Sequence, residues 1–383
     1  MEITELIEII ARAEDSKHQF KADVKNEISL AQEFVAFSNT LGGKIFIGIS
    51  DDGKISGLTR KDMERLANLV SNAASQHVKP SINPITENLS HPDGIVMVVN
   101  ISKGISKPYM DKDGIIWVKS GADKRKATAR EEIQRMYQNA GLIHGDEISA
   151  TGITISDIDK NLFIQFYESL YEESFEEQEL PLQQIFENLN LSRDGTLNIT
   201  GALLFGKNPE IRLPAFIVKC ITYSGTDIHE NIYVDSQDIT GAIKEVFDGT
   251  IDFILRNLRR IQKGQNVNSL GILEIPKISL EELIVNAIIH RDYFISAPIR
   301  IFIFSDRVEI ISPGHLPNNL TIENIKNGNS NIRNPILASF ATKILPYRGL
   351  GNGIRRALKA YPNIQFENDH DGNMFKCIIA RVV

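Results

Sequence analysis

The chain has 383 residues, of which 42% are hydrophobic and 24% charged, with a formal net charge of −7 and a sequence pI of about 5.7. This length predicts two or three domains with cores of their own. The acidic balance excludes a protein that coats nucleic acid through its overall charge, so any contact with nucleic acid requires a local basic patch. Cys220 and Cys377 each lie in an apolar run, which predicts buried reduced thiols and a cytoplasmic protein.

The sequence also argues against zinc binding, export and membrane insertion. It has no C-x-x-C pattern and no cluster of cysteines and histidines. Its first ten residues, MEITELIEII, carry acids where a signal peptide carries bases. Because the apolar runs are shorter than a membrane span, we expect no membrane partner.

Residues 1–140 are predicted to form one mixed α/β domain. Helices are expected over residues 2–13, 29–40 and 61–78, and strands over residues 17–21, 44–49, 82–87, 95–101 and 115–119. Gly42 and Gly43 end the second helix, and Asp51-Asp52-Gly53 predicts a turn.

A basic segment, KSGADKRKATAR, covers residues 119–130 and follows the strand that carries Trp117. Basic side chains in such a run could neutralise phosphates, and the aromatic ring could stack on a base. A solvated loop that leads into a helix is the alternative interpretation. The candidate nucleic-acid-binding residues are Lys21, Lys44, Lys119, Lys124, Arg125 and Lys126.

Residues 150–235 are predicted to form a middle connector region. Helices are expected over residues 156–171, 182–191 and 200–205, and a strand over residues 214–223. The acidic residues 172–179 predict a solvated connection. Both a winged-helix-like element and a structural linker fit this pattern.

The third region, residues 236–383, contains a helix with an unusual polar pair. After a long amphipathic helix over residues 240–260, a second helix is predicted over residues 278–293, with Glu282 and Asn286 four residues apart on one face. Asn286 offers the hard oxygen that Mg²⁺ accepts, and Glu282 could deprotonate a water that attacks a phosphate. In the alternative interpretation, Ser279 and Glu282 form a capping box and Asn286 is a hydrogen-bonded core amide.

Two further motifs follow this helix. Residues 298–304 and 308–311 predict a hairpin that ends in Ser312-Pro313-Gly314. The sequence RGLGNG at residues 348–353 then opens a helix. Glycines let a backbone approach phosphates, and the free N–H groups at a helix start attract anions.

The order of these motifs resembles the GHKL ATP-binding fold of gyrase, histidine kinases, chaperones and mismatch-repair proteins. The resemblance implies binding of ATP and Mg²⁺, with Glu282 as general base, Asn286 as Mg²⁺ ligand and residues 330–348 as a lid. Where the family has an aspartate that reads the adenine amine, this chain has Ser312. The HRDY sequence at residues 290–293, the SPG turn and Arg333-Asn334-Pro335 resemble bacterial transcriptional regulators and proteins related to the RecG helicase. The candidate nucleotide-binding residues are Asn286, His290, Arg291, Gly314, Arg333, Gly349, Gly351 and Gly353.

Phe20-Lys21 and the glycine-containing segments at residues 36–43 and 48–53 resemble the AlbA-type (divergent AAA-type) domain of Schlafen proteins, over about residues 1–135. The resemblance implies nucleic-acid binding and, in some members, a metal-dependent nuclease with three carboxylates. The first carboxylate falls on Glu14, the second on Gln19 and the third near Ser50 and Asp51. Because Gln19 cannot ionise, the metal cage loses a charge, and we expect weak or absent nuclease activity.

The sequence therefore predicts an α/β (α+β) protein with a mixed-sheet AlbA-like N-terminal domain, a small middle region and a C-terminal GHKL-type α/β sandwich. The first functional hypothesis is a homo-oligomeric regulator that binds ATP and DNA or RNA, with at most weak ATPase activity. The second is a Schlafen-like nuclease that uses Mg²⁺ or Mn²⁺, is gated by nucleotide and acts in phage defence. The third is an interaction scaffold in which both sites have decayed.

Overall fold

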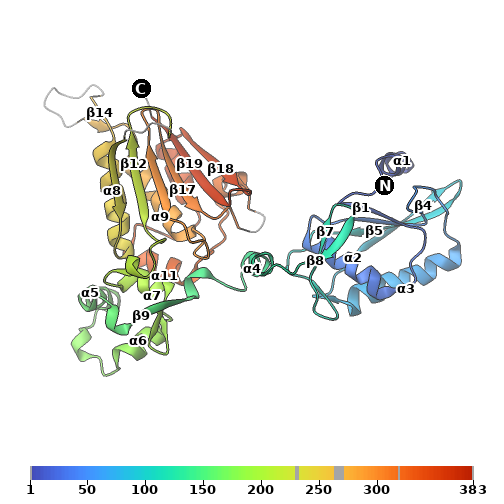
Figure 1. Cartoon of the computed structure of the whole chain (residues 1–383), viewed down its shortest axis with the longest axis horizontal. Helices are drawn as coiled ribbons and strands as arrows, with labels where there is room; N and C mark the ends of the chain where they lie inside the picture. The colour runs from blue at the N-terminus through green and yellow to red at the C-terminus, as the bar shows by residue number, and fades with distance from the viewer. Residues whose placement is uncertain (1, 229–232, 263–270, 318–319, 382–383) are drawn as a thin grey trace. The chain divides into compact units, whose positions relative to one another are not determined.

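The computed structural model describes residues 2–228, 233–262, 271–317 and 320–381 (Figure 1). Contacts between Cα atoms divide the chain into two compact units, Met1–Leu142 and Ile143–Val383. None of the described helices has the length and apolar character needed to cross a membrane.

The N-terminal unit is built on a four-stranded mixed sheet with the order β1-β2-β5-β4. Strands β1 (His18–Lys21) and β2 (Gly43–Ile47) are parallel, whereas β5 (Gly94–Ile101) runs antiparallel to both β2 and β4 (Ile85–His91). Side chains alternate between the two faces of a strand. Helices α2 (Glu27–Asn39) and α3 (Arg60–Gln76) share a core with one face, and α1 (Ile3–Ala11) shares a core with the other.

The start and end of α2 follow from local chemistry. The Asn26 side chain accepts hydrogen bonds from the backbone N–H groups of Ile28 and Ser29, which caps the helix. After the helix, Gly42 adopts φ +75°, and a Cβ at this position would lie 2.6 Å from the backbone nitrogen of Lys103. Only glycine fits this turn, so the helix stops where the sequence predicts.

Small elements complete the N-terminal unit. Strand β3 (Val78–Lys79) pairs with β6 (Met110–Asp111), and β7 (Trp117–Ser120) forms a hairpin with β8 (Asp123–Lys126). This hairpin packs on α2, and α4 (Arg130–Asn139) follows it.

The second unit contains a six-stranded sheet with the order β13-β12-β16-β17-β19-β18. Strands β12 and β16 are parallel, and every other neighbouring pair is antiparallel. The bounds are β12 Val218–Tyr223, β13 Tyr233–Ile239, β16 Ile299–Ile303, β17 Arg307–Pro313, β18 Ile364–Asp369 and β19 Met374–Ala380. Figure 1 shows α8 (Ile243–Asn257) and α9 (Lys277–His290) against this sheet.

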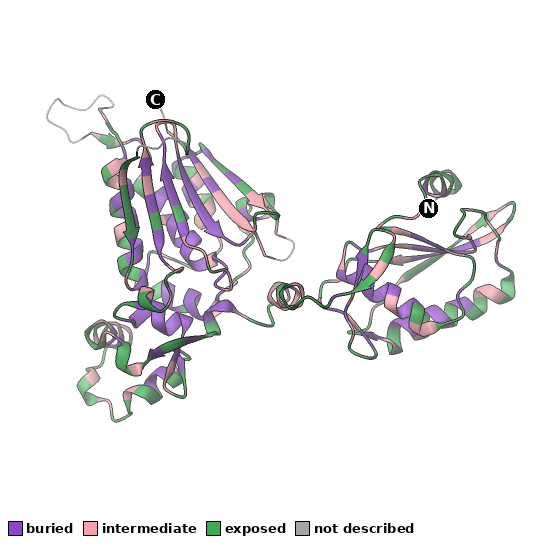
Figure 2. Cartoon of the chain, viewed as in Figure 1, coloured by how far each residue is buried: buried purple, intermediate pink, exposed green. Residues whose placement is uncertain are grey.

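One face of the six-stranded sheet supplies most of the core of the second unit. Alternate residues such as Cys220, Ile301 and Cys377 pack with α8 and α9, and Figure 2 shows the central strands as largely buried. Burial raises the pKa of both thiols to about 12, and both cysteines are free. The prediction of buried reduced thiols is confirmed.

The predicted middle region packs into the same core. Strands β9 (Ser149–Thr154), β10 (Ser192–Arg193) and β11 (Thr196–Asn198) form a small sheet, accompanied by α5 (Lys160–Tyr171), α6 (Leu182–Asn188) and α7 (Ile199–Phe205). The expected boundary at residues 235 and 236 falls inside β13, and β12 and β13 both belong to the six-stranded sheet. The remaining α-helices and strands are β14 (Arg260–Ile261), β15 (Ile272–Leu273), α10 (Ile322–Lys326), α11 (Pro335–Ile344) and α12 (Gly353–Ala360). The mixed α/β fold class predicted from the sequence is confirmed.

Asp146 ties the start of this unit to two of its helices. Its Oδ2 accepts a hydrogen bond of 2.9 Å from the Leu337 backbone N–H, and its carbonyl accepts one of 3.1 Å from the Thr200 hydroxyl. Its Oδ1 is buried without a hydrogen-bond partner among the described residues. Burial is the main cause that raises the pKa of Asp146 to about 6, because it disfavours the charged carboxylate.

We predict that Asp146→Asn stabilises the second unit at high pH and not at low pH. The carboxyl group binds its proton more tightly in the folded state, so its contribution to stability falls as the pH rises from about 4 to about 6. At pH 8 the neutral amide should raise the free energy of unfolding by about 2 to 3 kcal/mol, and at pH 4 the gain should vanish. Urea denaturation followed by circular dichroism measures both values. Asp252→Asn, at an exposed position of α8, is the control; a gain at Asp146 that is independent of pH would contradict the argument.

Candidate functional site

Helix α9 places Glu282 and Asn286 at a pocket of the second unit. The helix begins at Lys277, so Glu282 lies beyond the first turn, where no orphan backbone N–H needs a cap. The Ser279 hydroxyl instead donates a hydrogen bond of 3.0 Å to the carbonyl of Ala357. The capping-box interpretation of Ser279 and Glu282 is therefore wrong, and Glu282 does not serve as a helix cap.

Asn286 presents one particular atom to the pocket. Its Nδ2 donates a hydrogen bond of 2.5 Å to the carbonyl of Glu282, one turn earlier in the helix. The amide nitrogen is therefore occupied, and Oδ1 is the atom left for a ligand. Since the residue is half-buried and lines the pocket, it is not enclosed in dry core packing. An amide oxygen with this exposure fits Mg²⁺.

The glycine-rich segment lies directly against this polar pair. A Cβ at Gly353 would lie 2.6 Å from Glu282 Oε2 and 3.0 Å from Asn286 Nδ2. Gly349 and Gly351 adopt φ of +66° and +68°, a left-handed backbone conformation that glycine adopts without steric strain. Helix α12 begins at Gly353 without a side-chain cap, so its first N–H groups are available to an anion. The structure thus brings two distant motifs of the sequence into one pocket.

Six of the eight predicted nucleotide-binding residues line this pocket, and two do not. The six are Asn286, His290, Gly314, Gly349, Gly351 and Gly353. Arg291 is buried, stacks on the Phe216 ring at 4.6 Å and donates to the carbonyl of Ala297 at 2.7 Å. Arg333 donates to the carbonyl of His315 at 2.7 Å and lies behind Gly314. Arg333 therefore supports the wall of the pocket from outside, whereas the contacts of Arg291 are with residues that do not line the pocket.

The end of the pocket near β17 is neutral. Burial, with a smaller contribution from Arg333, lowers the pKa of His290 to about 4, so its imidazole is uncharged at pH 7. The Ser312 hydroxyl donates a hydrogen bond of 3.0 Å to the carbonyl of Ala287, one turn before His290. A neutral hydroxyl therefore stands where the resemblance implies a carboxylate.

Ser330, Asn331, Tyr347 and Arg348, at the two ends of the predicted lid, also line the pocket. The carbonyl oxygen of Gly328 lies 2.5 Å from the position of a Cβ at Gly351, so the loop before the lid packs on the glycine-rich segment backbone against backbone. Helix α11 occupies the middle of the lid segment.

Sequence reasoning missed Arg356 of α12, which forms an ion pair with Glu282. Its Nε donates to Glu282 Oε1 at 2.7 Å and its Nη2 lies 2.5 Å from the same oxygen. Its Nη1 donates to Asn352 Oδ1 at 3.1 Å. The signal was available, since an arginine in the first turn of a helix that opens at a glycine loop faces whatever the loop covers.

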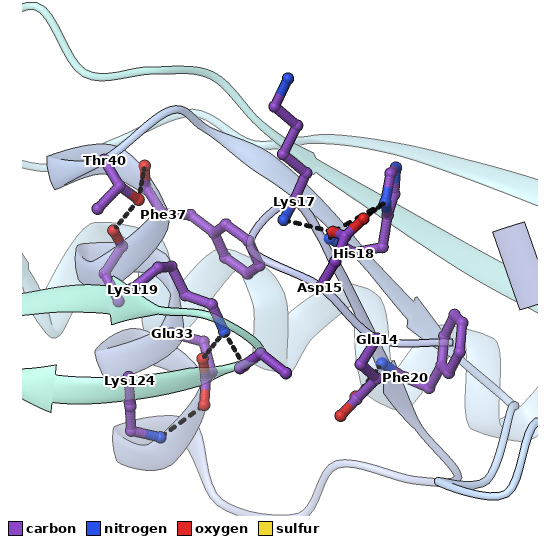
Figure 3. A network of polar contacts seen from close by, with 12 residues as sticks. Glu14, Asp15, Lys17, His18, Phe20, Glu33, Phe37, Thr40, Lys119 and Lys124 are labelled. Carbon is purple, nitrogen blue, oxygen red and sulfur yellow. Dashed lines mark hydrogen bonds and ion pairs between the residues drawn. The ribbon is translucent and has the colours of Figure 1, made fainter. Parts of the chain in front are cut away.

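In the N-terminal unit, Lys119 and Lys124 converge on Glu33 (Figure 3). The Nζ atoms lie 3.7 Å from Glu33 Oε2 and 2.6 Å from Glu33 Oε1 respectively. The Lys119 side chain is only 1% exposed, lies 4.8 Å above the Phe37 ring and has a pKa that burial lowers. This placement argues against the predicted phosphate contact by Lys119. The signal that sequence reasoning missed was Glu33, an acid inside the apolar face of α2.

The other predicted nucleic-acid-binding residues lie closer to the surface. Arg125 is exposed and pairs with Glu132 at 2.7 Å. Lys126 is exposed, with its Nζ 5.4 Å above the Trp117 ring. Lys44 pairs with Glu5 at 3.3 Å, and Lys21 lines a shallow hollow that also contains Glu33.

The positions that correspond to nuclease carboxylates do not form an acidic cluster. Glu14 Oε1 accepts a hydrogen bond of 2.6 Å from the Phe20 backbone N–H. Gln19 is buried, and its Oε1 has no hydrogen-bond partner among the described residues. The Ser50 hydroxyl hydrogen-bonds to Asp52 within a turn. Over the described ranges, no group of three or more His, Cys, Asp or Glu side chains could hold a metal ion.

We predict that Lys119→Met lowers the stability of the N-terminal unit by about 2 to 3 kcal/mol, because Glu33 Oε2 loses its buried cationic partner. Trp117 is the single tryptophan of the chain, so its fluorescence during urea denaturation reports this unit. Lys112→Met, at an exposed position, should change stability by less than about 0.5 kcal/mol. Equal effects of the two substitutions would show that the Lys119–Glu33 ion pair contributes nothing to stability.

Two family models match the chain. Residues 14–128 match the Schlafen AlbA_2 model, and residues 296–373 match the HATPase_c_4 model, described as "Putative ATP-dependent DNA helicase recG C-terminal". The chain therefore combines a Schlafen AlbA-type N-terminal domain with a RecG-related HATPase-type C-terminal domain.

Two solved structures are similar to this chain at low sequence identity. The crystal structure of the DIP2311 protein from Corynebacterium diphtheriae is 20% identical, with a TM-score of 0.47, over 99% of this chain and 80% of that chain. The solution structure of the N-terminal domain of a helicase RecG-related protein from Nitrosomonas europaea is 19% identical, with a TM-score of 0.25, over 34% of this chain and 96% of that chain. With TM-scores below 0.5, neither likeness carries a functional inference. No curated protein matches the chain.

Proposed function

We propose that the protein is an ATP-binding and nucleic-acid-binding regulator, in which the nucleotide state of the C-terminal domain controls nucleic-acid binding or assembly. The observation that carries this proposal is the meeting of Glu282, Asn286 and the glycine-rich residues 349–353 in one pocket. The match of residues 296–373 to a HATPase-type family supports ATP as the ligand.

The residues at the pocket suit the parts of a nucleoside triphosphate. The N–H groups at the start of α12 would hold phosphate oxygens, and Asn286 Oδ1 would hold Mg²⁺. Bound Mg²⁺ would screen the charge of the phosphates. The neutral end, with His290 and Ser312, would take the base, where the hydroxyl makes a weaker contact with an exocyclic amine than a carboxylate does.

The N-terminal domain would supply the nucleic-acid contact. Its match to the Schlafen AlbA_2 family supports a nucleic-acid partner, and the exposed cations on β8 supply positive charge beside an aromatic ring. Binding is favoured over cleavage, because Gln19 is neutral and Glu14 is engaged with the backbone. Nucleotide binding by the C-terminal domain would promote assembly into a homo-oligomer, and this assembly would change nucleic-acid binding by the N-terminal domain.

We predict that Asn286→Ala abolishes binding of Mg²⁺-ATP by the full chain, because the substitution removes the hard oxygen from the pocket. Isothermal titration with ATP in excess Mg²⁺ measures this directly. Asn161→Ala, an exposed asparagine of α5, is the matched control and should bind like the wild type. An Asn286→Ala variant with wild-type affinity would remove the assigned role of Asn286.

We predict that Lys126→Glu weakens binding of single-stranded nucleic acid by about tenfold. The fall of log affinity with log salt should become less steep, with a slope smaller in magnitude by about one. Lys343→Glu on α11 changes the net charge by the same amount at an exposed position of the other unit. Fluorescence anisotropy with labelled DNA and RNA oligonucleotides at several salt concentrations compares the two variants. If both variants lose affinity equally, overall charge rather than β8 makes the contact.

A further inference from the structure

Arg356 occupies the carboxylate that the proposed function assigns as general base. Two guanidinium nitrogens lie within 2.7 Å of Glu282 Oε1, and Oε2 faces the backbone of Gly353. The Glu282 side chain is 6% exposed, so bulk water scarcely reaches it. In this arrangement Arg356 occupies Oε1, so that oxygen is not placed to accept a proton from an attacking water.

Arg356 is also within the pocket that would receive the phosphates. It lines the pocket, sits in the first turn of α12 and is 27% exposed at its side chain. Its neighbour Arg355 does not contact Glu282 and instead lies near Gly328. The two adjacent arginines therefore differ in their contact with Glu282, which Arg356 makes and Arg355 does not.

Charge decides which partner Arg356 takes. Glu282 offers a single negative charge, whereas the end of a nucleoside triphosphate brings several, on oxygens that match the planar guanidinium fork. The Asn352 side chain holds Nη1, so the guanidinium can turn from one acceptor to the other while one hydrogen bond is kept.

We propose that Arg356 alternates between Glu282 and the terminal phosphate of a bound nucleoside triphosphate, so that Glu282 becomes an available base only when the site is filled. This inference rests on the proposed nucleotide binding. Once Glu282 is released, it takes a proton from water as the water oxygen bonds to the terminal phosphorus. The bond from that phosphorus to the bridging oxygen breaks, and its electron pair leaves with the nucleoside diphosphate. Arg356 is thus a positioning residue that links phosphate occupancy to base availability.

Binding measurements test the switch without requiring turnover. The experiment titrates the full chain with the non-hydrolysable triphosphate AMP-PNP and, separately, with ADP, each in excess Mg²⁺. Four proteins form a double-mutant cycle: wild type, Glu282→Gln, Arg356→Gln and the double variant. Glutamine keeps the size of Glu282 against Gly353, and far-UV circular dichroism checks that each variant is folded.

The switch predicts that Glu282→Gln binds AMP-PNP about tenfold more tightly than the wild type. In this variant Arg356 gives up no ion pair when it turns to the terminal phosphate. In the Arg356→Gln background the same substitution should change the affinity by less than about twofold. ADP, which lacks the terminal phosphate, should show a smaller gain. In an Arg355→Gln background, the matched control, the tenfold gain for AMP-PNP should persist.

Three results would overturn the account, and they separate the proposed function from the switch. If the wild type binds neither nucleotide, the proposed function fails and this inference fails with it. If the wild type binds AMP-PNP but Glu282→Gln gains equally with and without Arg356, Glu282 merely repels phosphate and the switch is wrong. An unchanged affinity in Glu282→Gln would overturn it as well.

Discussion

The packing of α12 on α9 is the constraint on which the candidate nucleotide site depends. Glycine at residue 353 lets the backbone of one helix approach the Glu282 and Asn286 side chains of the other. A Cβ there would lie 2.6 Å from Glu282 Oε2 and 3.0 Å from Asn286 Nδ2, so both side chains would have to shift. The Ser279 hydroxyl and the Ala357 carbonyl hold the two helices together further along. The polar pair on α9 therefore lies against the start of α12, where the first N–H groups have no side-chain cap, and a helix start of this kind favours an anionic ligand.

The N-terminal unit uses its cations differently from what their spacing in the sequence indicates. Two of the five basic residues at 119–130 neutralise Glu33, and a third pairs with Glu132. A buried carboxylate needs such partners, because an unpaired charge inside a protein is costly. Cations that pair with a buried carboxylate are not available to bind phosphates at the surface. The outer edge of β8 and the Trp117 ring therefore remain as the candidate nucleic-acid contact. This arrangement also fits the acidic composition of the chain as a whole.

Local sequence patterns predicted the positions of helices and strands well, but they did not predict which distant side chains contact one another. Helices α2 and α9 lie within two or three residues of their predicted bounds, because caps, glycines and apolar spacing are encoded locally. The meeting of residues 282 and 286 with residues 349–353 came only from resemblance to a family, since no local signal joins segments so far apart. Glu33 in the apolar face of α2 and the arginine in the first turn of α12 were local signals, but the partners that Lys119 and Arg356 take depend on which side chains the fold brings together. The burial of Arg291 and the contact of Arg333 with His315 depend on the fold in the same way.

A structure of the full chain with Mg²⁺ and AMP-PNP tests the central claim most directly. The account predicts the triphosphate against the backbone of residues 349–353, a metal ion bonded to Asn286 Oδ1, and the Arg356 guanidinium turned from Glu282 toward the terminal phosphate. A nucleotide bound elsewhere, or a pocket that stays closed at saturating AMP-PNP with the Arg356–Glu282 pair intact, would contradict it.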